Sequence, residues 1–129
     1  SGRPAVVYGA KNLEREDMLA LFVAADVMVV TPLRDGMNLV AKEFVAAKSD
    51  HTGVLVLSTR AGAADHLVQA VLVDPLDHGA LSLALLTAIN MDSAQAKERM
   101  VTMREYLSVH DVAAWASDIL GDLASREAS

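Results

Sequence analysis

Short apolar runs alternate along this chain with segments in which apolar residues recur every three or four positions. The clearest run, Asp26–Thr31, is almost unbroken in apolar residues and ends at Pro32, which is typical of a parallel strand buried on both faces. Similar runs predict the other strands, so that we expect about four. The remaining strand candidates are Ala5–Tyr8, Val54–Leu57 and Val71–Val73.

The segments between and after these strands have the period of amphipathic helices. Glu14–Ala25 places apolar residues three and four apart and begins with acidic residues, which are favourable at a helix N-terminus. Strands that alternate with helices predict an α/β fold with one parallel sheet, helices on its faces and two or three C-terminal helices. The other predicted helices are Asn38–Lys48, Ala61–Val68, Asp77–Asn90, Ser93–Val109 and Asp111–Ser125.

The chain has 129 residues, which is long enough for one domain. Its composition excludes several classes of function. The net charge of -6 argues against nucleic acid as a partner. With no cysteine, disulfides, zinc-thiolate sites and thiol catalysis are excluded, and we expect a reducing, cytoplasmic setting. The most apolar stretch, Met18–Val30, is too short to span a membrane and contains Asp26. The first residues carry no apolar signal segment and suggest a cut end.

Candidate chemistry lies at the carboxyl ends of the strands, where open parallel sheets bind ligands. In the loop Thr31–Asn38, Gly36 permits a tight turn or a close approach to a ligand. The helix that follows presents free N–H groups and the positive end of its dipole, which together favour an anion such as phosphate. Asp35 suits a sugar hydroxyl better than a phosphate, and Glu43, one turn after Leu39, suits paired ribose hydroxyls.

Each of these features also has an interpretation without a ligand. A Pro-x-x-Asp-Gly sequence before a helix is often turn and capping chemistry, and this loop lacks the dinucleotide-binding glycine pattern. The small residues of Ser58–Asp65 favour close packing of helix on strand. The four histidines show no metal-ligand spacing, and the charged residues Lys97–Arg99 and Arg104–Glu105 are expected to face solvent. Trp115 belongs to an apolar stripe that would dock on another surface.

The segment Ala24–Phe44 resembles the central motif of the trehalose-6-phosphate synthases, and the resemblance covers nearly the whole chain. It continues through Val54–Ser58, Ala61–Ala64, Val73–Pro75 and His110–Trp115. That family consists of retaining glycosyltransferases of the GT-B type, in which two Rossmann-like domains face a cleft. The resemblance implies that residues 1–129 form the C-terminal portion of the nucleotide-sugar donor domain, with a Rossmann-like sheet.

The resemblance also implies roles for individual residues. Asp35 would be the catalytic-site residue that contacts hydroxyls of the donor glucose, Glu43 would bind the donor ribose, and Leu13 would lie near the base. Neither a metal nor a cofactor is implied. The remaining donor-binding residues would be Gly36, Met37, Asn38, Leu39, Val40, Ala41 and Lys42.

The implied reaction is transfer of glucose from UDP-glucose, or another nucleotide diphosphate glucose, to glucose 6-phosphate with retention, in trehalose biosynthesis. This chain would supply donor binding alone and would be inactive by itself, because the acceptor site would lie in a preceding domain. Thr59, Arg60 and His66 depart from the family pattern beside the cleft. The alternatives are a non-catalytic module that acts through assembly, including homo-oligomers, and a related transferase with another acceptor.

Overall fold

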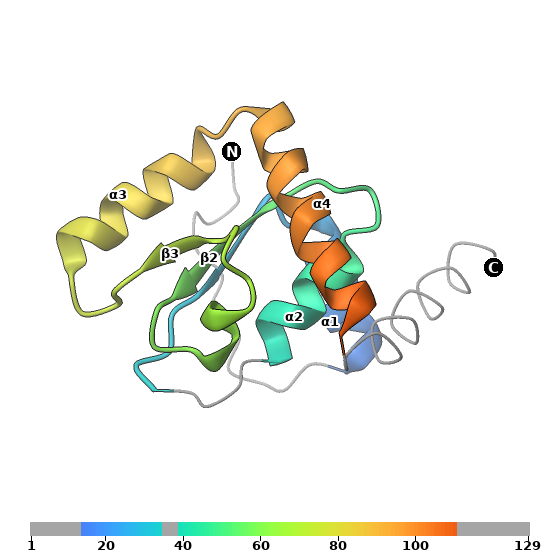
Figure 1. Ribbon diagram of the computed structural model, residues 1–129, viewed down its shortest axis with the longest axis horizontal. Helices are drawn as coiled ribbons and strands as arrows, with labels where there is room; N and C mark the ends of the chain where they lie inside the picture. The colour runs from blue at the N-terminus through green and yellow to red at the C-terminus, as the bar shows by residue number, and fades with distance from the viewer. Residues whose placement is uncertain (1–13, 35–38, 111–129) are drawn as a thin grey trace, which may run out of the picture.

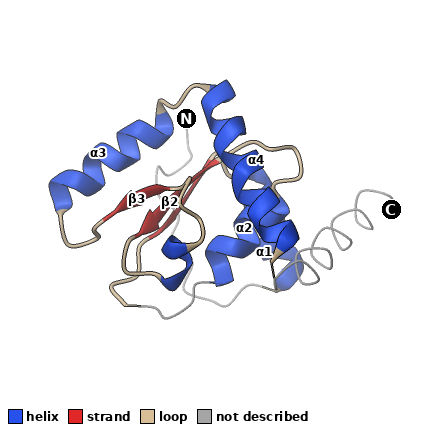
Figure 2. Cartoon of the chain, in the orientation of Figure 1, coloured by secondary structure: helices blue, strands red, loops and turns tan. Residues whose placement is uncertain are grey.

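Three parallel strands form the sheet in the computed structural model, which describes residues 14–34 and 39–110 (Figure 1). The strand order is β1-β2-β3, with Val27 opposite Val54 and Val56 opposite Val71. Helices and strands alternate up to β3, and two helices follow it (Figure 2). The elements are α1 (Arg15–Ala24), β1 (Val27–Val30), α2 (Leu39–Ala47), β2 (Val54–Ser58), the 3-10 turn η1 (Gly62–Asp65), β3 (Val71–Val73), α3 (His78–Ile89) and α4 (Ser93–Val109).

The central strand β2 divides the core into two layers, because successive side chains of a strand point to opposite faces of the sheet. Leu55 and Leu57 pack with residues of α1, α2, η1 and α4. Val54 and Val56 pack on the other face with Ala84 and other residues of α3. The ribbon shows the same arrangement, with α3 apart from the group of α1, α2 and α4 (Figure 1). The protein is therefore a three-layer α/β structure, as the alternation predicted.

Within the described residues, the predicted strands and the predicted helices other than Ala61–Val68 are confirmed with small changes at their ends. Asp92, predicted as a boundary, caps α4 by accepting hydrogen bonds from the N–H groups of Ala94 and Gln95 at 3.1 and 3.4 Å. The predicted strand Ala5–Tyr8 and the predicted helix Asp111–Ser125 lie outside the described residues. Three of the four expected strands are thus observed.

Two predictions about local structure are wrong. The strand β1 is not buried on both faces, since it lies at the edge of the described sheet and Val29 is 42% exposed, whereas every residue of β2 is buried. The segment Ala61–Val68 does not form a helix of its predicted length. Its small residues pack closely in the core as one 3-10 turn, and the chain then returns to β3.

Two arginines of α4 also differ from their predicted place in solvent. Arg104 donates from Nη1 to the carbonyl oxygens of Val45 and Ala46 at 2.9 and 2.6 Å. Arg99 donates from Nη1 to the carbonyl oxygen of Gln69 at 3.0 Å. Both side chains are partly buried, and they add hydrogen bonds to carbonyl groups near the end of a helix and in a loop. Arg104 therefore fixes the C-terminal end of α2 against α4.

Candidate functional site

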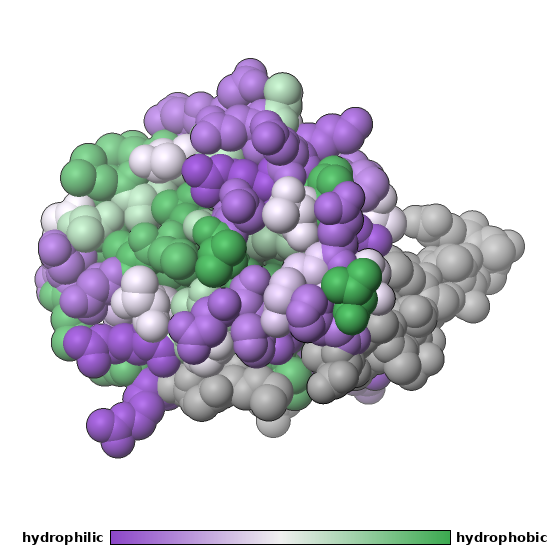
Figure 3. Space-filling view, viewed as in Figure 1, coloured by the Kyte–Doolittle hydropathy of each residue, from purple (hydrophilic) through white to green (hydrophobic). Residues whose placement is uncertain are grey.

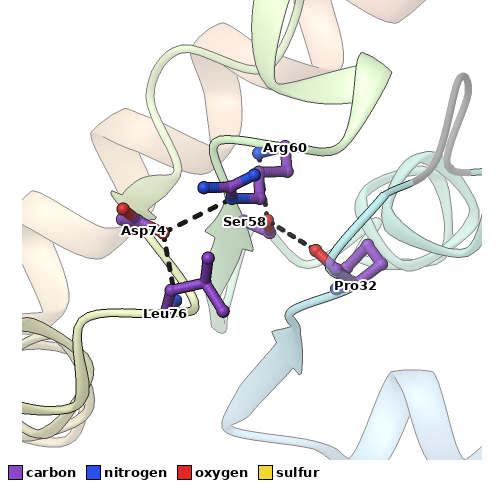
Figure 4. A network of polar contacts seen from close by, with 5 residues as sticks. All are labelled: Pro32, Ser58, Arg60, Asp74 and Leu76. Carbon is purple, nitrogen blue, oxygen red and sulfur yellow. Dashed lines mark hydrogen bonds and ion pairs between the residues drawn. The ribbon is translucent and has the colours of Figure 1, made fainter.

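The loops that follow the three strands are joined at the carboxyl edge of the sheet by a network of polar contacts (Figure 4). Its central residue is Ser58, the last residue of β2, whose side chain is fully buried. The Ser58 hydroxyl donates to the carbonyl oxygen of Pro32 at 2.8 Å, and its oxygen accepts from the N–H of Arg60 at 3.0 Å. Ser58 thus connects the loop after β1 to the loop after β2.

The loop after β3 is joined to the same network by an ion pair. Arg60 Nε lies 3.5 Å from Asp74 Oδ1, and the two side chains are 45% and 51% exposed. Asp74 also accepts from the N–H of Leu76 at 3.0 Å, and the N–H of Thr59 donates to the carbonyl oxygen of Val73 at 3.0 Å. An ion pair this exposed contributes about 0–1 kcal/mol, so the buried Ser58 contacts are the firmer part of the network.

Helix α2 begins at Leu39, beyond the loop after β1, and carries five of the predicted donor-binding residues on its first turns. Leu39 and Val40 are exposed, although both are apolar, at 46% and 43%. Partial burial raises the pKa of Glu43 above its ordinary value, and the nearby charge of Arg15 opposes that rise. A carboxylate held where burial disfavours its charge is a common feature of functional sites. The start of α2 therefore combines exposed apolar residues with a glutamate whose pKa is raised.

Lys42 has a buried side chain, 5% exposed, that points away from solvent toward the next loop. Its Nζ lies 3.2 Å from Nδ1 of His66. Because an ammonium group only donates, this contact requires the His66 tautomer with the proton on Nε2. The His66 ring stacks on Tyr106 of α4 with centroids 5.5 Å apart, and Tyr106 stacks on His110 at 3.7 Å. Lys42 thus connects α2 to η1 and α4.

The structure describes only part of the predicted site. Leu39, Val40, Ala41, Lys42 and Glu43 are together on the first turns of α2. The other predicted site residues lie outside the described residues, and these are Leu13, Asp35, Gly36, Met37 and Asn38. The donor-binding assignments therefore stay predictions.

The described residues contain neither a metal-binding cluster nor a membrane-spanning helix. Across residues 14–34 and 39–110, no group of three or more His, Asp or Glu side chains could hold a metal ion. Over the same residues, no helix is both long and apolar enough to cross a bilayer. A cavity of about 380 Å³ lies at the opposite edge of the sheet, where Val27 and Val54 begin their strands, and Ile89 and Met91 complete part of its wall. That cavity is separate from the carboxyl edge.

Sequence reasoning missed the residues that connect the loops. Ser58 carried a signal, since a single hydroxyl ends an otherwise apolar strand. The pairing of Arg60 with Asp74 and the contact of Lys42 with His66 had no signal in the sequence, because their partners are 14 and 24 positions apart.

Comparison with known proteins gives matches over nearly the whole chain. The sequence model of glycosyltransferase family 20 matches residues 2–125. The trehalose-6-phosphate synthase of Mycolicibacterium gilvum is 48% identical over 126 residues, which are 98% of this chain and 25% of that protein. The chain therefore spans about a quarter of the length of the curated relatives it matches.

Solved structures agree with these matches. An α,α-trehalose-phosphate synthase (UDP-forming) from Burkholderia xenovorans, in complex with glucose-6-phosphate, superposes with a TM-score of 0.77 and 44% identity over 88% of this chain and 25% of that one. An E. coli structure described as bound with UDP-2-fluoro glucose gives a TM-score of 0.77 and 41% identity, again over 88% and 25% of the two chains. The family match and these identities show that the chain belongs to glycosyltransferase family 20.

Proposed function

We propose that residues 1–129 are the C-terminal portion of the donor-binding domain of a trehalose-6-phosphate synthase. In this proposal the complete enzyme transfers glucose, with retention, from UDP-glucose to glucose 6-phosphate. The chain supplies the donor wall of the cleft and is inactive alone, because the acceptor site belongs to the rest of a longer polypeptide. The supporting matches are to a UDP-forming enzyme with bound glucose-6-phosphate and to a protein bound with UDP-2-fluoro glucose. We place this activity in the cytoplasm.

The observation that carries the proposal is the start of α2 at the carboxyl edge of a parallel sheet, beside a partly buried Glu43. In the proposed complex, the backbone N–H groups at the helix start hold the diphosphate and no metal is needed. Glu43 accepts from the ribose hydroxyls, and Asp35 contacts the glucose hydroxyls. Leu13 lies near the base, and residues 36–42 supply the other donor contacts.

A titration of the chain with UDP-glucose, followed by amide chemical shifts, tests donor binding. We expect shift changes at Leu39–Glu43 at millimolar ligand, and we expect Glu43→Ala to weaken binding severalfold. Glu98→Ala is the matched control, because Glu98 is an exposed acid on α4, far along the chain from α2. The absence of shift changes at Leu39–Glu43, or equal weakening by both variants, contradicts the proposal.

A second candidate function, assembly with another chain, is favoured by the outer face of α3. This helix contains no Asp, Glu, Lys or Arg, and Leu83, Leu86 and Ile89 are 66%, 56% and 68% exposed. Apolar residues gather over α3 and β3 in the space-filling view (Figure 3). An uncharged apolar face suits contact with a second copy of itself, because a two-fold interface places the same residues on both sides. Trp115, whose apolar stripe is predicted from the sequence to dock on another surface, lies outside the described residues.

Light scattering after size exclusion tests this candidate. We expect a dimer that Leu86→Glu converts to a monomer, whereas Glu105→Gln, an exposed change on α4, leaves it intact. A monomeric wild-type chain refutes assembly through α3.

A further inference from the structure

We infer that Ser58 is a positioning residue for donor binding, which acts by fixing the segment Thr31–Arg34 at the carboxyl edge of the sheet. The inference rests on the proposed function. None of the donor-binding roles proposed above includes Ser58, and its hydroxyl bonds to Pro32 and Arg60, neither of which is proposed to contact the donor. Its effect on the donor therefore has to pass through the backbone that it holds.

Ser58 uses its hydroxyl fully. The O–H donates to the Pro32 carbonyl at 2.8 Å and the oxygen accepts from the N–H of Arg60 at 3.0 Å, while the side chain is 0% exposed. A buried hydroxyl with both functions satisfied fixes the groups it joins more firmly than an exposed one, because water cannot replace either partner. The Ser58 side chain thus ties the loop after β1 to the loop after β2 (Figure 4).

The contact restricts the chain effectively because the residue it holds is a proline, Pro32. The pyrrolidine ring of Pro32 fixes its own φ, so holding its carbonyl oxygen also restricts the direction in which the chain continues. Leu33 and Arg34 follow, both exposed, and the proposed sugar contact comes directly after Arg34 in the sequence. Without the hydroxyl, the Pro32 carbonyl loses its partner and the segment is free to shift.

Helix α2 is held in place by other contacts. Phe44 is fully buried and packs edge-on against Phe22, with centroids 6.2 Å apart. Arg104 donates to the carbonyl groups at the end of α2, and Lys42 is fixed to His66. Loss of the Ser58 hydroxyl should therefore disturb the segment Thr31–Arg34 more than α2, the helix that carries the proposed ribose contact. The expected result is a selective loss of affinity for the sugar part of the donor.

The test compares the affinities of the chain for UDP-glucose and for UDP, measured by NMR titration. In Ser58→Ala we expect the Kd for UDP-glucose to rise about 2- to 10-fold, the range that corresponds to one net hydrogen bond. The Kd for UDP should change less than about 2-fold, since Glu43, the proposed ribose contact, is on α2. A change that merely loosened the fold would raise both Kd values together. The ratio of the Kd for UDP-glucose to the Kd for UDP therefore distinguishes a positioning role from a purely structural one.

Three further variants make the comparison decisive. Ser58→Thr keeps the hydroxyl and should restore the wild-type ratio. Ser58→Cys has a similar shape with a weaker donor, should raise the ratio of the Kd for UDP-glucose to the Kd for UDP, and replaces Ser58→Ala in the test if that variant does not fold. Ser108→Ala is the matched control, because Ser108 donates to a backbone carbonyl at the same 2.8 Å but is exposed on α4, and it should leave the ratio unchanged.

The outcomes separate the inference from the proposed function. An unchanged ratio in both Ser58→Ala and Ser58→Cys, with normal binding by the wild-type chain, overturns the inference alone. Equal weakening of both ligands overturns it as well. A wild-type chain that binds neither ligand refutes the proposed function, and the role of Ser58 is rejected with it.

Discussion

Replacement of Gly53 by alanine tests how tightly α2 is packed against the start of β2. Gly53 has a φ of +91°, in the region that favours glycine, and a Cβ added there would lie 2.9 Å from Lys48 Cε and 3.2 Å from Phe44 Cζ. Neither neighbour can retreat easily. Lys48 is 2% exposed and donates to the carbonyl oxygen of Val23 at 2.7 Å, while Phe44 is fully buried.

The expected destabilisation is the sum of two costs and one gain. Left-handed backbone costs a residue with a Cβ about 1–2 kcal/mol, and crowding in a packed core costs about 1–3 kcal/mol. Alanine restricts the unfolded chain more than glycine does, which returns about 0.4–1 kcal/mol. The free energy of unfolding should therefore fall by about 1–4.5 kcal/mol. For a chain of this size, that lowers the Tm by roughly 4–18 °C.

Thermal unfolding followed by circular dichroism measures this change, with Gly79→Ala as the control. Gly79 lies in the first turn of α3 without a positive φ, and its nearest neighbour would be Asp77 Oδ1 at 3.6 Å. Alanine there should be neutral or stabilise by up to about 1 kcal/mol. Shortening Lys48 in Lys48→Ala should make the added Gly53→Ala change less costly, because the nearest contact is gone. A Tm for Gly53→Ala within about 2 °C of the wild type would refute the reasoning.

Three other predictions concern the contacts of α2. Arg104→Met should lower the free energy of unfolding by about 1–3 kcal/mol in urea titrations, because two carbonyl groups lose a buried donor; equal stability would contradict that anchor. Glu43→Gln should raise the Tm at neutral pH, with the gain vanishing as the pH falls below the ordinary pKa of a glutamate. The folded-state pKa of Glu43 is raised by burial, so its charged form destabilises the fold only above that range; a gain that persists in acid would contradict this sign. His66→Glu should raise the Tm by a few degrees, since a carboxylate would face the Lys42 ammonium; a lower Tm would contradict the contact.

The alternation of apolar runs and amphipathic segments was enough to predict the fold of this chain. Strand and helix periods depend on local geometry, so Val54–Leu57 and Ser93–Val109 could be placed to within one residue from the sequence. The cap at Asp92 is equally local, because its partners are two and three residues away. The motif around Asp35 and Glu43 indicated the family, and the family match over residues 2–125 confirmed it.

Only the tertiary structure decided which apolar strand is central and which charged residues are buried. β1 and β2 look alike in the sequence, yet β1 is at the edge of the described sheet and β2 is enclosed by helices on both faces. The side chains of Arg104, Lys42 and Ser58 contact partners that lie 24 to 59 positions away in the chain. Periodicity reports only which face of an element is apolar. The partners of buried polar groups depend on which loops the folded sheet brings together, and that is a property of the whole chain.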